Sequence, residues 1–168
     1  EVNAPTVFNA RYNFVQFWDG RAADLAEQID GPINHPDEMA IGWEGAVKAL
    51  QAIPEYVDAF GALYADGITI ANIKNAIVAF ENTLVTPNSR FDRFLQGEAT
   101  LSPLEKKGYD IFQSYGCVAC HQGINIGGNM YQHLGIMEDF FKDRGDLSPK
   151  DYGRYNVTGK EEDKFMFK

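Results

Sequence analysis

The sequence predicts an all-α protein in which helices are joined by long irregular loops. Apolar residues recur at spacings of three or four along several segments, as expected for helices with one buried face. The clearest of these stripes contains Ile70, Ile73, Ile77, Phe80 and Leu84. Strand signals are weak, and glycine is frequent in the last third of the chain, which favours loops there.

Capping residues and prolines predict where the helices begin and end. We expect helices over residues 24–29, 43–53, 54–64, 69–84, 91–95 and 102–115. Gly31-Pro32 is expected to end the first of them, Pro54 to separate the second from the third, and Thr69 to cap the fourth. Residues 152–158 are the best strand candidate, although a poor one.

The last predicted helix has the strongest local signals. Ser102-Pro103-Leu104-Glu105 is a capping box with proline at the first helical position, and Gly116 is expected to end the helix. Its apolar face comprises Leu104, Gly108, Ile111, Phe112 and Tyr115. This helix leads directly into the chain's two cysteines.

The run Cys117-Val118-Ala119-Cys120-His121 predicts a covalent attachment site for haem c. Two thiols three positions apart can each add to a haem vinyl group, and the adjoining histidine can then bind the iron as proximal ligand. The same run is compatible with a disulfide, half of a zinc site or a thioredoxin-like dithiol. Zinc would need further ligands, but there is no third cysteine, and His35 and His133 are the only other histidines. A dithiol does not require the histidine.

Composition limits the remaining possibilities. The 168 residues are 45% apolar, enough for one or two small domains, and the best boundary lies near residues 97–101. A net charge of −9 argues against nucleic acid or anionic lipid as partner and is compatible with steering of a basic redox partner. No apolar run approaches the roughly 18 residues of a membrane span.

Two sequence features concern the cellular location. The first five residues lack the basic and apolar regions of a signal peptide. The chain does not begin with an initiator Met, so we expect Glu1 to be a processed or trimmed end. Haem c is attached on the outer side of the bacterial inner membrane, so the motif predicts a periplasmic protein.

Several further motifs occur in a characteristic order along the chain. They are Asn3–Asn9, Phe17–Ala22, Glu27-Gln28, Gly31–Ile33, Pro36–Met39, Phe80–Leu84, Thr86-Pro87, Phe91–Arg93 and Gly127–Met130. Together with the cysteine motif they make the chain similar to the central part of a bacterial dihaem cytochrome c peroxidase, in the family that also includes MauG-like enzymes.

This resemblance implies two cytochrome c-like domains, each with one haem. Residues 1–98 would be the remainder of the N-terminal peroxidatic domain, and residues 99–168 the first part of the C-terminal electron-transfer domain. Only the second haem motif is present, so a second haem c and its ligands are expected outside the given residues. The chain is then a fragment of a longer protein.

The resemblance also implies roles for individual residues. Glu38 and Gln28 match the positions that move a proton and orient the leaving hydroxide during peroxide cleavage, and we expect both on one loop braced by Pro32 and Pro36. Trp18 matches a tryptophan between the two haems that couples them electronically. Asn3 matches a residue that helps to bind calcium at the interdomain junction.

The sixth iron ligand of the electron-transfer haem is expected beyond Lys168. Met130, Met137 and Met166 are the methionines that could replace it, and Met130 is the preferred substitute, followed by His133.

The sequence therefore predicts part of a periplasmic peroxidase that reduces hydrogen peroxide with electrons from a small cytochrome c or a cupredoxin. This chain would hold the electron-entry haem. A single-haem electron carrier without catalysis and a MauG-like oxidase of a protein substrate are the alternatives, and a homodimer is left open.

Overall fold

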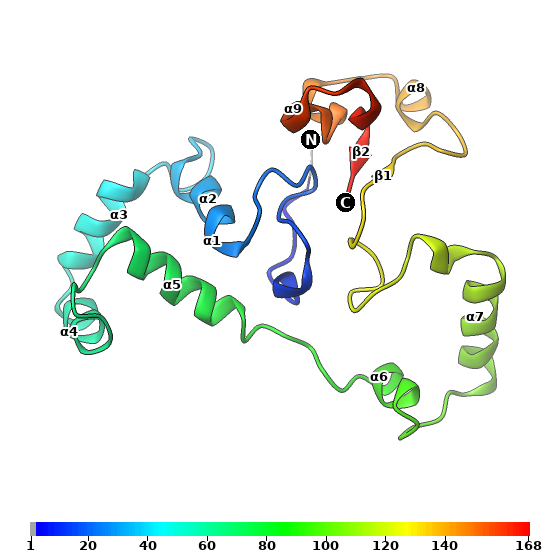
Figure 1. Cartoon of the computed structure of the whole chain (residues 1–168), viewed down its shortest axis with the longest axis horizontal. Helices are drawn as coiled ribbons and strands as arrows, with labels where there is room; N and C mark the ends of the chain where they lie inside the picture. Colours follow the sequence, from blue (N-terminus) through cyan, green and yellow to red (C-terminus); the bar gives the residue numbers. More distant parts are fainter. Residues whose placement is uncertain (1–2) are drawn as a thin grey trace. The chain divides into compact units, whose positions relative to one another are not determined.

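The structure is a computed structural model that describes residues 3–168, and it is mostly helical with little strand (Figure 1). The all-α prediction is confirmed. The α-helices are α1 (Leu25–Gln28), α2 (Asp30–Asn34), α3 (Gly42–Gln51), α4 (Pro54–Leu63), α5 (Ile70–Glu81), α6 (Arg90–Leu95), α7 (Pro103–Ser114), α8 (Phe140–Arg144) and α9 (Tyr155–Thr158). Short 3₁₀ helices cover Ala10–Tyr12, Cys117–Ala119, Pro149–Tyr152 and Glu161–Asp163. Within the described chain, no helix is both long and apolar enough to cross a membrane.

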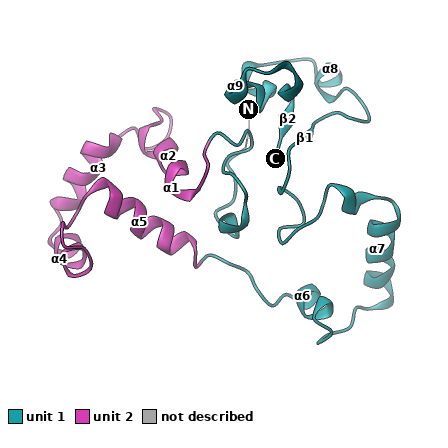
Figure 2. Cartoon of the chain, in the orientation of Figure 1, with its two compact units in different colours: residues 1–21, 84–168 teal, residues 22–83 magenta. Residues whose placement is uncertain are grey.

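The chain forms two compact units (Figure 2). Unit 2 comprises residues 22–83, and unit 1 comprises residues 84–168 together with the segment that ends at Arg21. These units are defined by packing of the polypeptide, whereas the boundary predicted after residue 98 separates haem-binding domains. That division into residues 1–98 and 99–168 stays a prediction.

Unit 2 is organised around a small apolar core between α3, α4 and α5. Phe60, Ile68 and Ile73 are its buried members. The partly buried side chains packed against them are Trp43, Val47, Leu50, Tyr64, Ala76 and Ile77. Helix α1 packs against α5, and α2 packs against α3. Of the helical stripe predicted from the sequence, Ile73 and Ile77 lie in this core. The rest of that prediction is wrong, because Ile70 and Phe80 are 41% and 64% exposed and Leu84 lies beyond the end of α5 at Glu81.

The predicted caps of unit 2 are present, with one correction. The Thr69 hydroxyl accepts a hydrogen bond from Asn72 N at 3.2 Å, and Pro54 begins α4. The prediction that Gly31-Pro32 ends the first helix is wrong, because both residues lie inside α2. Proline is tolerated in a first helical turn, where its missing N–H would have no intrahelical acceptor.

The C-terminal part of unit 1 contains a small antiparallel ladder of β1 (Gln132–His133) and β2 (Met166–Phe167). The prediction of a strand over residues 152–158 is wrong. These residues end one 3₁₀ helix and form α9, because Gly153 and Gly159 adopt left-handed conformations with φ of 57° and 68° that an extended strand does not contain.

An ion pair between a buried aspartate and a partly exposed arginine fixes this C-terminal part. Both carboxylate oxygens of Asp151 accept from the Arg144 guanidinium, at 3.0 and 2.6 Å, and Oδ2 also accepts from Ser148 N and Oγ at 2.7 and 2.8 Å. The Arg144 hydrogen bonds, followed by those from Ser148, hold the pKa of Asp151 far below its usual value. Phe141 stacks on Phe165 beside this pair, with ring centroids 4.7 Å apart.

In unit 2, Asp30 ties the first turn of α2 to two other helices. Its carboxylate accepts from Trp43 Nε1 on α3 and from Lys74 Nζ on α5, each at 2.7 Å. The hydrogen bond from Lys74, followed by that from Trp43, lowers the pKa of Asp30 below its ordinary value of 3.8.

We predict that Asp30→Asn lowers the free energy of unfolding at pH 7 by up to about 1 kcal/mol, since a side chain that is 41% exposed is partly screened by water. A lowered native pKa means that the contribution of Asp30 is complete above pH 3.8 and is lost as the pH falls through the native pKa. Urea unfolding should therefore give a larger difference from wild type at pH 7 than at pH 3. Asp58→Asn, at an exposed position of α4, is the control that should change little. An equal loss for Asp30→Asn at both pH values would contradict the assignment.

Candidate haem and catalytic sites

Helix α7 is capped at its start and packed on one side by α6. Ser102 Oγ accepts from Glu105 N, and Ser102 N donates to the Glu105 carboxylate at 2.8 Å, so the predicted capping box is confirmed. Tyr109 of α7 lies edge-on to Phe91 and Phe94 of α6, with ring centroids 5.4 and 5.9 Å apart. These contacts orient α7 while leaving its other faces uncovered.

A tight turn after α7 presents both thiols and the histidine together. Gly116 adopts φ of 81°, the left-handed conformation that ends many helices, and the 3₁₀ helix Cys117–Ala119 follows. His121 N donates to Cys117 O at 2.9 Å, which closes the turn across the motif. Both cysteines are exposed and unpaired, so they form no disulfide in this structure.

A zinc site, another of the three alternatives to haem c, needs more ligands than the turn supplies. Among residues 3–168, no group of three or more His, Cys, Asp or Glu side chains comes together to hold a metal ion. The described residues therefore offer no complete zinc site of that kind.

The imidazole of His121 lies between a helix and a glycine loop. Its ring centroid is 6.5 Å from that of Phe112 on α7. On the other side, a Cβ added to Gly127 would be 3.4 Å from His121 Nδ1, and Gly127 has φ of 140°. Gly127 thus lies next to the Nδ1 side of the His121 ring.

Exposed apolar side chains lie in this turn and along the helix that precedes it. Leu104 in the first turn of α7 and Tyr115, the C-cap of α7, are 79% and 80% exposed, and Val118 in the turn is 41% exposed. Two thiols, one imidazole and an adjoining apolar surface are the residue types that a covalent haem requires. The residues at this site therefore fit haem c.

The candidate catalytic pair lies in unit 2. Gln28 is the last residue of α1, and Glu38 is an exposed residue in the turn after α2, where Glu38 N donates to His35 O at 3.1 Å. The expectation that both lie on one loop is wrong, because α2 separates them. Asp30, at the start of α2, connects this segment to the unit 2 helices.

Trp18 lies in unit 1, where its Nε1 donates to Asn3 O at 2.7 Å. Trp18, Asn13, Asn125 and Gly127 are among the residues that line a cavity of about 500 Å³. Because Gly127 also approaches His121, the structure brings Trp18 and the loop beside the histidine to the same cavity.

The possible sixth ligands differ in their surroundings. Met130 is half-buried, and its Sδ accepts from Gln132 Nε2 at 2.9 Å. Met166 and His133 are paired residues in the β1 and β2 ladder. The Met130 thioether would have to leave Gln132 to bind iron, whereas Met166 and His133 are held by backbone pairing.

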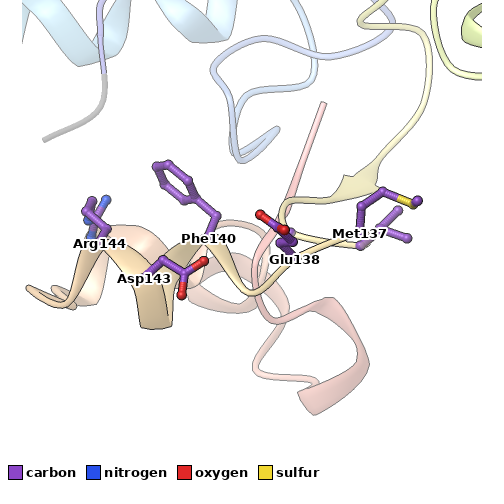
Figure 3. Close-up of a pocket in the computed structure, with 7 residues that line it drawn as sticks. Met137, Glu138, Phe140, Asp143 and Arg144 are labelled. Carbon is purple, nitrogen blue, oxygen red and sulfur yellow. The ribbon is translucent and has the colours of Figure 1, made fainter.

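Met137 is the most exposed of the candidates, at 94%. It lines an open pocket of about 570 Å³ and lies at the opposite end of it from Asp143 and Arg144 of α8 (Figure 3). Among the described contacts, none orients the Met137 thioether toward the cysteine motif.

The sequence alone did not identify the polar pairs that hold the segment with Gln28 and Glu38 and the loop beside His121. Asp30 and Lys74 are 44 positions apart, and Asn125 Nδ2 reaches Asn13 Oδ1 at 3.1 Å across 112 positions. Neither pair belongs to a local motif, so nothing in the local sequence pattern could have identified it.

A helical fold with an exposed Cys-x-x-Cys-His turn is typical of c-type haem proteins. The family profile described as di-haem cytochrome c peroxidase matches residues 1–100, and the chain belongs to this family. The resemblance inferred from the motifs is thus confirmed, and membership implies haem c as cofactor.

Two relatives and one solved structure illustrate the similarity. "Cytochrome c551 peroxidase" from Nitrosomonas europaea is 46% identical over 99% of this chain and 49% of its own length. "Methylamine utilization protein MauG" from Paracoccus denitrificans is 37% identical over 67% of this chain and 32% of its own length. The crystal structure of "a MauG-like protein associated with microbial copper homeostasis" has a TM-score of 0.81, with 24% identity over 99% of this chain and 53% of that chain. The chain therefore spans about half the length of the peroxidase, and the last comparison establishes the fold alone.

We predict that Gly116→Val lowers haem attachment, because a β-branched residue in the left-handed conformation costs about 1–2 kcal/mol and would open the turn that aligns the thiols. Gly67→Val is the matched control, since Gly67 has φ of 64° and open space at its Cβ but lies in unit 2. Covalent haem per chain should fall for Gly116→Val alone. Equal haem content in the two variants would show that the turn geometry does not matter.

Proposed function

We propose that this chain is part of a di-haem cytochrome c peroxidase that reduces hydrogen peroxide to water, and that it carries the electron-entry haem. The observation that supports this most directly is the turn in which Gly116 and the His121 N to Cys117 O bond place two exposed thiols beside one imidazole. Bound haem supplies the redox-active iron that peroxide reduction needs. A second haem, outside these residues, would be the one that meets peroxide.

The residues of unit 1 would hold the haem of this chain. Cys117 and Cys120 would form thioether bonds to it, and His121 would bind the iron through Nε2. The exposed apolar residues Leu104 of α7 and Tyr115, its C-cap, would pack on the macrocycle and thereby lose contact with water. Attachment to the polypeptide keeps the cofactor in place without requiring a large core in this unit.

In unit 2, Glu38 and Gln28 would serve the peroxidatic haem. The Glu38 carboxylate would accept a proton from the bound peroxide oxygen and return it to the leaving oxygen. The Gln28 amide would donate a hydrogen bond that orients the leaving hydroxide. Exposure of Glu38 in the structure leaves its carboxylate accessible for this role.

Trp18 would couple the two haems. Support comes from the cavity that Trp18 and Gly127 line together, since Gly127 is adjacent to the proposed iron ligand His121. Asn3, whose carbonyl accepts from the Trp18 indole, would contribute its amide oxygen to a calcium ion, and the other ligands would come from elsewhere.

Electrons would come from a small cytochrome c or a cupredoxin in the periplasm. Of the net charge of −9, nearly all lies in residues 22–83, which contain ten Asp or Glu and two Lys. This charge would attract a basic donor over long distances and less strongly at high salt.

A MauG-like oxidase acting on a protein substrate is the second candidate, because a protein of that name is 37% identical to this chain. A peroxidase would turn over hydrogen peroxide with a small reduced donor alone. An oxidase of this second kind would need its protein substrate, and a plain single-haem carrier would consume no peroxide.

We predict that Glu38→Gln in the full-length protein lowers peroxide turnover by about 10²- to 10⁴-fold, the usual contribution of a general acid or base. Steady-state oxidation of a reduced donor by peroxide measures this. Glu44→Gln, an exposed acid in the first turn of α3, is the matched control and should retain turnover. Wild-type turnover in Glu38→Gln would remove Glu38 from the mechanism.

We also predict that the haem of the isolated 168-residue chain lacks a native His/Met ligand pair. Its spectrum should be high-spin or mixed and should respond to cyanide or imidazole. If the Met130 thioether leaves Gln132 and binds the iron, the spectrum should also change in Met130→Ala. A clean low-spin His/Met spectrum that survives Met130→Ala, Met137→Ala and Met166→Ala, tested separately, would contradict this prediction.

A further inference from the structure

The backbone turn that carries Trp18 has an unusual conformation. Gly20 N donates to Phe17 O at 3.2 Å, and both Phe17 and Gly20 have positive φ, 64° and 66°. A left-handed phenylalanine is unfavourable and persists only where surrounding contacts impose it. The Arg21 guanidinium lies over the Phe17 ring, 3.5 Å from the centroid, and the other contacts of this turn come from far along the chain.

All three carbonyls from Trp18 to Gly20 accept hydrogen bonds from the C-terminal segment of unit 1. Lys168 N donates to Trp18 O at 2.9 Å. Arg154 Nη1 donates to Asp19 O at 3.1 Å and to Gly20 O at 2.8 Å. A single part-buried guanidinium nitrogen therefore satisfies two consecutive carbonyls of the turn.

The position of Arg154 is itself fixed. Its backbone N donates to Met166 O at 2.8 Å, which joins it to β2. Its guanidinium lies over the Tyr131 ring, 4.8 Å from the centroid, and Phe14 contacts the same ring edge-on at 5.2 Å. A planar guanidinium can stack on an aromatic ring and donate in its own plane at the same time, which a lysine ammonium cannot.

The tyrosine also determines the residue type opposite it. A Cβ at Gly20 would overlap the buried Tyr131 hydroxyl, and it would also be 2.9 Å from Val15 Cγ2. Only glycine therefore allows the turn to approach the tyrosine closely enough for Arg154 to reach both carbonyls.

We propose that Arg154 is a positioning residue that fixes the Trp18 indole by holding the Trp18–Gly20 turn against the Tyr131 ring. Residues from the two ends of unit 1 thereby set where the indole lies relative to the glycine loop beside His121. The consequence for electron transfer rests on the proposed function of Trp18, but the positioning itself does not.

The first test measures the indole directly. The full-length protein with its haems is labelled with 5-fluorotryptophan, and the Trp18 resonance in the ¹⁹F NMR spectrum is identified by its absence from Trp18→Phe. Arg154→Met should shift or broaden this resonance, and Arg154→Lys should give an intermediate shift. An unchanged Trp18 resonance in Arg154→Met would overturn the proposal.

Matched variants separate positioning from charge and from folding. Lys150→Met removes an exposed positive charge from the same segment and should leave the Trp18 resonance unchanged. If Arg154→Met does not fold, Arg154→Lys decides: a shifted resonance in a variant of wild-type melting temperature supports the proposal, and an unshifted one contradicts it.

The second test measures the rate of electron transfer between the haems by stopped flow. Arg154→Met should slow it about tenfold, because small displacements of a coupling group are costly. In a Trp18→Phe background the same substitution should cause no further loss, whereas equal losses in both backgrounds would contradict action through the indole. If Trp18→Phe alone leaves the rate unchanged, the proposed role of Trp18 fails, and the ¹⁹F spectrum alone judges Arg154.

Discussion

The left-handed conformation of Gly116 is the constraint on which the candidate haem site depends. It ends α7 and reverses the backbone so that His121 N can donate to Cys117 O, which places both thiols and the imidazole on one short turn. Helix α7 can lead into this turn because Tyr109 is packed by two phenylalanines of α6. A local backbone requirement and a small aromatic cluster thus define the geometry of the site.

The two compact units are stabilised in different ways. Unit 2 has a core of apolar side chains centred on Phe60, Ile68 and Ile73, as expected for packed amphipathic helices. In unit 1, by contrast, hydrogen bonds of Asp151 and Arg154 join segments that contain little regular structure. A covalently bound haem would stabilise such a unit, because exposed apolar side chains of unit 1 could pack on the macrocycle.

The sequence predicted what is local and failed where tertiary contacts decide. The caps at Thr69 and Ser102 were predictable because each is a hydrogen bond between residues three positions apart. Pro32 was misinterpreted as a helix end, since a proline in a first turn and a proline after a last turn look alike without the fold. Gln28 and Glu38 were identified by resemblance, but α2 between them was not.

Long-range polar contacts were beyond any sequence pattern. Arg154 and the carbonyl of Gly20 are 134 positions apart, and a backbone acceptor leaves no trace in the sequence. Such contacts nonetheless fix the segments that carry Trp18 and the candidate catalytic residues. The residue types of the site could therefore be predicted, whereas the residues that position them could be found only in the structure.

The central claim is that this chain binds one haem covalently at its Cys-x-x-Cys-His turn, and peptide mapping tests it most directly. Trypsin cleavage after Lys107 and Lys142 releases a peptide that contains both cysteines and His121. Mass spectrometry of the protein, purified from cells that mature c-type cytochromes, should find this peptide with the mass of one haem added through two thioether bonds. Recovery of the same peptide with two free thiols, from protein that is otherwise folded and active, would contradict the claim.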